Sequence, residues 1–154
     1  MPQKEIYRSE LIVELHVPDF QRAYDFYKLL GFELAWMEED YMVLKSGAQA
    51  ICFYGGSSSV ANHSYFGKFP EHTKKGYGVE LVVFVDDIQG LYKSIEEKIT
   101  VVRELTTRPW GAADFRVEDP FGFYIRVSQR YEMVNRDDKI EQTSKIVDNK
   151  KFVL

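Results

Sequence analysis

The chain has 154 residues, of which 45% are hydrophobic and 29% charged, so it can bury a core and is not disordered throughout. Its net charge of −4 argues against a nucleic-acid partner, which usually requires a basic surface. No apolar run approaches the roughly 18 residues that span a membrane, so we expect no membrane partner. The single cysteine, Cys52, excludes an internal disulfide, and with no apolar leader near the N-terminus we expect a cytoplasmic protein.

The first structural unit predicted is a strand followed by a helix. Apolar and polar residues alternate over 11–17, which is the period of a strand. Asp19 suits the N-cap of a helix, because its carboxylate can accept from the free N–H groups of the first turn. Apolar residues then recur at helical spacing from Phe20 to Leu30, and Gly31 is typical of the residue that ends a helix.

A second copy of this unit follows later in the chain. Residues 79–85 alternate, Asp87 can cap, and the apolar residues from Ile88 to Ile99 have helical spacing. A shift of 68 residues aligns Val17 with Val85, Asp19 with Asp87, Gln21 with Gln89 and Tyr24 with Tyr92. We interpret this as a duplication.

Three short strands are predicted after each helix. They cover roughly 33–37, 40–45 and 49–54 in the first half and roughly 101–106, 112–118 and 123–129 in the second half. The predicted fold class is therefore α+β, with two βαβββ modules at about 10–55 and 78–129. We expect one domain over 1–129, with a linker at 56–77 and a polar tail at 130–154.

Glu80 and Arg126 are the most informative residues for function, because each is a charge on an otherwise apolar strand. Alternation places Glu80 on one strand face with Phe84, and Arg126 on one face with Tyr124. Two alternatives remain: the charges pair with each other, or they hold a polar ligand group.

Three segments resemble the vicinal-oxygen-chelate superfamily, which includes glyoxalase I, extradiol dioxygenases and bleomycin-resistance proteins. They are VPDFQRAYDFYKLLGF, VFVDDIQGLYKSI and PWGAADFRVEDPFGFYIRVSQ. The resemblance implies cupped mixed sheets with the helices on the outer face. It also implies that the metal-ligand positions of the enzymes fall on Ile12, Cys52, Glu80 and Arg126. Because Ile12 has no donor and Arg126 is a permanent cation, the chain is most similar to the metal-free bleomycin-resistance branch.

We therefore predict a metal-independent, small-molecule binding protein with no cofactor, which sequesters an antibiotic or another aromatic or polar ligand. The resemblance implies a homodimer whose clefts form where two chains meet. The candidate ligand-binding residues are Glu80, Arg126, Trp110, His16, Phe84, Tyr124, Cys52 and Ile12. The alternatives are a metal-dependent lyase, isomerase or dioxygenase, and a structural dimer without a ligand.

Several single residues have two possible roles. Trp110 can stack on a ligand or pack against the domain, and His16 can be a general base in a cleft or a structural residue. Cys52 is expected to be a small buried residue. We expect His63 and His72 to be solvated in the linker, and Lys74 and Lys75 to be surface charges.

Overall fold

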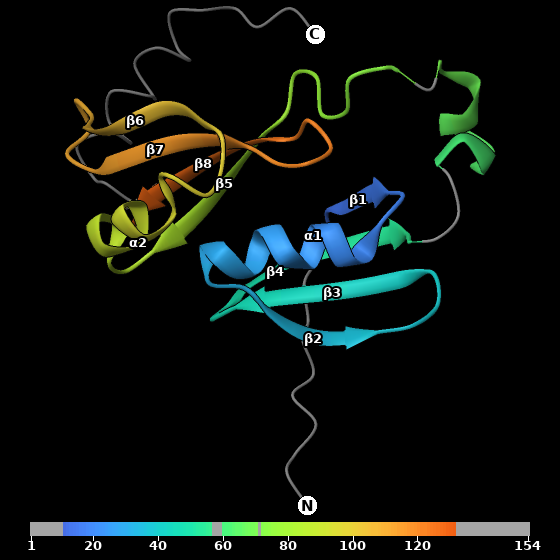
Figure 1. Ribbon diagram of the computed structural model, residues 1–154, viewed down its shortest axis with the longest axis horizontal. Helices are drawn as coiled ribbons and strands as arrows, with labels where there is room; N and C mark the ends of the chain where they lie inside the picture. Colours follow the sequence, from blue (N-terminus) through green and yellow to red (C-terminus); the bar gives the residue numbers. More distant parts are fainter. Residues whose placement is uncertain (1–10, 57–59, 71, 132–154) are drawn as a thin grey trace, which may run out of the picture.

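Two βαβββ modules follow one another in the computed structural model, which describes residues 11–56, 60–70 and 72–131 (Figure 1). The first module contains β1 (Glu14–Val17), α1 (Phe20–Tyr27), η1 (Lys28–Leu30), β2 (Glu33–Met37), β3 (Tyr41–Ser46) and β4 (Gln49–Gly55). Two short 3₁₀ helices follow, η2 (Val60–Asn62) and η3 (Phe66–Lys68). The second module contains β5 (Glu80–Val85), α2 (Ile88–Ile95), β6 (Val101–Thr107), β7 (Ala113–Glu118) and β8 (Tyr124–Gln129).

Both modules form a four-stranded mixed sheet with the same topology. The strand orders are β1-β4-β3-β2 and β5-β8-β7-β6. In each sheet the first strand is parallel to the last, and the other pairs are antiparallel. The structure thus confirms the predicted α+β class and paired modules.

The predicted capping residues begin both helices. The Asp19 carboxylate accepts a 3.0 Å hydrogen bond from the Arg22 backbone N–H, and Asp87 accepts one of 3.0 Å from the Gly90 N–H. Each carboxylate satisfies a donor that has no partner within the helix. Gly31 follows the first helical segment with a φ of 94°, a conformation that favours glycine.

A single hydrophobic core spans both modules. Its largest fully buried side chains include Tyr27, Phe53 and Phe115. Helix α1 covers the first sheet on the side of the second module (Figure 1), and the Arg22 guanidinium lies 5.5 Å from the centre of the Phe121 ring. Helix α1 therefore also contacts the second module, rather than lying wholly on an outer face.

A side chain of the first module binds the backbone of the second. The Gln49 amide nitrogen donates to the Phe84 carbonyl at 2.8 Å, and the Phe84 N–H donates to the Gln49 amide oxygen at 2.7 Å. Strand β5 is at the edge of its sheet. Gln49 therefore binds the N–H and the C=O of Phe84 on the free side of β5, as a neighbouring strand would.

The predicted first strand is too long. Strand β1 begins at Glu14, and Ile12 precedes it with 60% of its surface exposed. The hydrogen bond from the Cys52 N–H to the Val13 carbonyl, at 3.3 Å, lies just before the paired residues of β1 and β4, which start at Glu14 and Cys52. The predicted tail lies almost entirely outside the described residues. No helix in the described ranges has the length and apolar character needed to cross a membrane.

Candidate functional site

Glu80 and Arg126 form an ion pair on the open face of the second sheet. The Glu80 Oε1 atom lies 3.5 Å from Arg126 Nε and 3.2 Å from an Nη of Arg116, on the neighbouring strand β7. Both arginine side chains are mostly buried, whereas about a third of the Glu80 side chain is exposed (34%). One carboxylate thus neutralises two guanidinium groups in part.

The ion pairs extend along β7. Asp114, which has no exposed surface, lies 2.8 Å from Arg108 Nε and 3.6 Å from Arg116. Burial lowers the pKa of Arg116, but the Tyr124 hydroxyl, Glu80 and Asp114 outweigh it, so the pKa lies above its ordinary value. We define this group of Arg108, Asp114, Arg116, Glu80 and Arg126 as the arginine network. It contains three cations and two carboxylates.

Aromatic residues surround Arg126. Its guanidinium carbon lies 5.7 Å from the centre of the Trp110 ring, and one Nη donates to the Tyr131 hydroxyl at 3.3 Å. The Phe84 ring packs edge-on against Tyr131 with centroids 5.4 Å apart. Tyr124 instead accepts a 3.4 Å hydrogen bond from Arg116. Besides Glu80 and Arg126 themselves, three predicted ligand-binding residues contact the arginine network or its aromatic surroundings: Trp110, Phe84 and Tyr124.

The arginine network does not fit a divalent metal ion. At the four positions that the resemblance singled out, Glu80 and the Cys52 thiol carry the donor atoms, and the Glu80 carboxylate is already bound by two cations. Ile12 has no donor atom, and a guanidinium repels a metal ion. Within the ranges that the structure describes, no three His, Cys, Asp or Glu side chains are grouped so as to hold a metal.

On the first sheet, Glu14 and Tyr41 form a hydrogen bond beside Cys52. The Tyr41 hydroxyl donates to Glu14 at 2.7 Å, and its ring stacks on Trp36 with centroids 5.3 Å apart. Burial, and then the neighbouring Cys52 thiol and Glu14 carboxylate, raise the pKa of Tyr41. Tyr41 therefore remains a neutral donor. Cys52 itself is half-buried and free, and it pairs with Glu14 in the sheet register.

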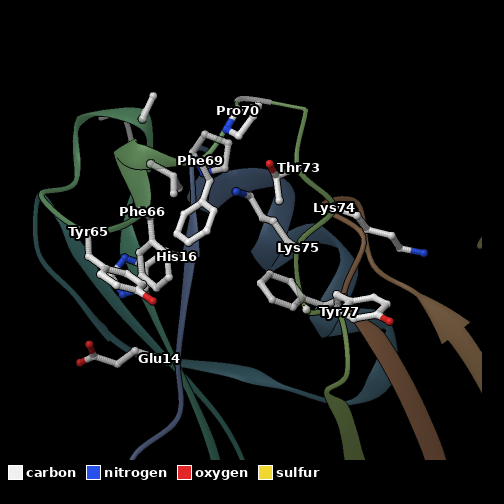
Figure 2. Close-up of a pocket in the computed structure, with 15 residues that line it drawn as sticks. Glu14, His16, Tyr65, Phe66, Phe69, Pro70, Thr73, Lys74, Lys75 and Tyr77 are labelled. Carbon is white, nitrogen blue, oxygen red and sulfur yellow. The ribbon is translucent and has the colours of Figure 1, made fainter.

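A cavity of about 720 Å³ opens beside His16 (Figure 2). Strand β1 supplies Glu14 and His16 to its wall, and Phe123 comes from the end of the β7–β8 turn. Most of the remaining wall comes from the segment predicted as a linker: Val60, Ala61, Tyr65, Phe66, Phe69, Pro70, Thr73, Lys74, Lys75, Gly76 and Tyr77. We call this cavity the linker pocket.

His16 lies among aromatic rings at the wall of the linker pocket. Its ring centroid is 4.7 Å from Phe66, 4.9 Å from His63 and 5.0 Å from Tyr54. Burial, the neighbouring His63 and the Lys75 ammonium lower the pKa of His16, and Glu14 opposes them. A neutral His16 is the form that this environment favours.

His63, expected to be solvated, is half-buried and is also hydrogen-bonded to the backbone. Its Nδ1 atom accepts hydrogen bonds from the backbone N–H groups of Tyr65 at 3.0 Å and Phe66 at 3.2 Å. These bonds fix the turn that places Phe66 against His16. His72 is exposed, as expected.

The structure does not bring the eight predicted residues together. Glu80, Phe84, Tyr124, Arg126 and Trp110 lie on the second module, and Trp110 lines a second pocket of about 480 Å³. Ile12, His16 and Cys52 lie on the first module, and His16 lines the linker pocket.

Sequence reasoning missed two sets of residues. One is the partners in the arginine network, namely Arg108, Asp114 and Arg116. The other is the aromatic wall of the linker pocket, although three aromatic residues within 65–69 were a visible signal.

The model of the Glyoxalase/Bleomycin resistance protein/Dioxygenase superfamily matches residues 11–127. The chain belongs to this superfamily. No curated protein sequence matches it.

Solved structures of several superfamily proteins are similar to this chain. A bleomycin-binding protein in complex with bleomycin has a TM-score of 0.54 at 16% identity, over 80% of this chain and 100% of that chain. A bleomycin resistance determinant encoded on transposon Tn5 has 0.57 at 18% identity, over 81% and 100%. A lactoylglutathione lyase from Agrobacterium tumefaciens has 0.56 at 21% identity, over 79% and 94%. At these identities the similarity shows the fold alone.

Proposed function

We propose that this protein binds a small molecule without a metal ion, in the manner of bleomycin-resistance proteins, and sequesters it. The linker pocket is the observation that carries the proposal. Its volume of about 720 Å³ lies within the range of small-molecule sites, roughly 300–1,000 Å³, and its wall is mainly apolar, with several aromatic rings and a few polar groups. Such a wall supplies apolar contact area for a ligand that contains rings.

The donor atoms favour binding over metal chemistry. In the superfamily's metal enzymes the ligand positions supply imidazole or oxygen donors, whereas Ile12 and Arg126 supply neither here. Glu80 is occupied by Arg116 and Arg126. Ion pairs in place of metal ligands favour sequestration over metal catalysis. The lone Cys52 favours a cytoplasmic location, where thiols stay reduced.

We further propose a homodimer. Large apolar side chains are exposed at both edges of the first sheet, namely Leu11, Ile12 and Val13 before β1 and Leu34, Trp36 and Met37 on β2. Exposed apolar groups of this kind are typical of surfaces that a partner covers. Sedimentation velocity at micromolar concentration should give the mass of two chains, and a monomer would contradict this part of the proposal.

The experiment is a binding screen combined with a metal assay. The protein is purified without chelators, its Mn, Fe, Co, Ni and Zn contents are measured, and aromatic compounds are titrated by calorimetry before and after EDTA treatment. We expect substoichiometric metal and binding that EDTA does not change. Phe66→Ala should weaken binding at least about fivefold, because one stacked ring is worth about 1–3 kcal/mol in aromatic stacking sites. Val102→Ala, which truncates an exposed apolar side chain on β6 away from the linker pocket, is the control.

The same data test the enzyme alternative. A stoichiometric metal that is lost in Glu80→Ala, together with lyase, isomerase or dioxygenase activity, would overturn the proposal.

A further inference from the structure

The wall of the linker pocket matches a planar apolar ligand. Tyr65, Phe66, Phe69 and Tyr77 are large rings that each remain at least 37% exposed, and all four line the same cavity. Tyr65 packs against Phe66 and Phe69 with centroids 5.2 and 5.7 Å apart, so the rings hold one another in place. Rings that are exposed singly need no explanation, but four around one cavity indicate a ligand.

The polar groups of the linker pocket favour one charge sign. Lys75 is half-buried, and its ammonium group points into the space between Phe69 and Thr73 (Figure 2). Among the described residues no carboxylate forms an ion pair with it, whereas Lys74 points away and lies 3.9 Å from Glu118. The Glu14 carboxylate also points away from this space, and it accepts the Tyr41 hydroxyl.

A turn holds Lys75 in this place. Gly76 has a φ of 74°, and a Cβ atom at this position would lie 2.7 Å from the Phe123 ring. The Val79 N–H also donates to the Gly76 carbonyl at 2.9 Å. The backbone beside Lys75 is therefore fixed against an aromatic residue of the pocket wall, so the Lys75 side chain starts from a defined position at this wall.

We propose that the linker pocket takes an aromatic compound with one acidic group, such as a carboxylate, sulfonate or phosphate, and that Lys75 is the charge partner of that group. Thr73 lies beside it and supplies a hydroxyl donor. This inference rests on the proposed function and adds the ligand's charge to it.

The test uses three probes of matched shape, 2-naphthoate, 2-naphthamide and 2-naphthylmethylammonium, titrated into the full chain by calorimetry. We expect naphthoate to bind about tenfold more tightly than the neutral amide, because a charge-assisted hydrogen bond exceeds a neutral one by about that factor. The ammonium probe should bind most weakly. Lys75→Met should abolish the difference in affinity between naphthoate and the amide. Lys74→Met should preserve the difference.

Each contrary result has a distinct meaning. If the amide or the ammonium probe binds as tightly as naphthoate, the inference about charge is wrong while the binding function stands. If naphthoate is preferred equally in Lys75→Met, Lys75 is not the charge partner. If none of the three probes binds to wild-type protein with native thermal stability, the linker pocket is not a site for aromatic compounds and the proposed function fails with it.

Discussion

The Tyr27 hydroxyl donates a 2.8 Å hydrogen bond to the Asp119 carboxylate, 92 residues later in the chain. Asp119 also accepts from the backbone N–H groups of Phe121 and Phe123, each at 2.9 Å. Burial raises the pKa of Asp119, although all these hydrogen bonds oppose the change. Helix α1 is thereby attached to the turn between β7 and β8.

Tyr27→Phe should lower the free energy of unfolding by about 1–3 kcal/mol, because it leaves a buried carboxylate oxygen without its donor. Urea denaturation measures the change. Tyr24→Phe, on the same helix and half-buried, should change stability by less than about 0.5 kcal/mol. Equal losses in the free energy of unfolding would mean that the hydrogen bond to Asp119 does not stabilise the contact between the modules.

Within the arginine network, Glu80→Leu should cost more stability than Arg126→Leu. The first leaves two guanidinium groups without their shared carboxylate, whereas after the second Glu80 still pairs with Arg116. We expect Glu80→Leu to lower the free energy of unfolding by about 1–3 kcal/mol. This loss is smaller than for a fully buried pair, because Glu80 is partly exposed.

The double variant Glu80→Leu/Arg126→Leu should be no less stable than Glu80→Leu alone, which a denaturation cycle measures. Lys28→Ala, which removes an exposed ion pair with Asp25, should leave the stability close to that of the wild type, because solvent screens exposed pairs. Additive effects at Glu80 and Arg126 would show that the two residues do not act as a pair.

Gln49→Ala should expose the Phe84 amide. In the native protein the Gln49 side chain accepts from this N–H, so its loss should speed amide hydrogen exchange at Phe84 much more than at Val127 in the core. Exchange measured by NMR gives both rates. Unchanged protection at Phe84 would contradict the role of the side chain at this edge.

Stability should fall as the pH drops below about 6.5, the ordinary pKa of histidine. The pKa of His16 is lowered in the folded chain, so the unfolded chain takes up the proton first and is favoured in acid. NMR titration of His16 should give a lower midpoint in native protein than in urea. His16→Asn should flatten the dependence of stability on pH in this window. If stability still changes with pH as in the wild type, other groups cause the dependence.

Local patterns predicted most of the fold, because they depend on neighbouring residues. The Asp19 and Asp87 caps follow from the side chain and the first helical turn alone. The partners of Glu80 could not be predicted in full. Arg116 faces the same side as Arg126, but their proximity depends on the register that places these two residues opposite each other in β7 and β8.

The linker pocket was missed for a different reason. Gly, Ser and Asn residues made 56–77 look like a connection, and no periodicity shows that Phe66 turns toward His16. That orientation depends on the His63 side chain, which binds the backbone of the next turn. Long-range placement of this kind has no local signal.

The contact between Gln49 and Phe84 also bears on self-association. An open sheet edge can template the addition of a foreign strand, which begins aggregation. By occupying both the N–H and the C=O of one edge residue, Gln49 removes the hydrogen-bonding groups that an incoming strand would need near the C-terminal end of β5. The uncharged Gln49 side chain thus blocks the addition of a strand at this point of the edge, without placing a charge near the core.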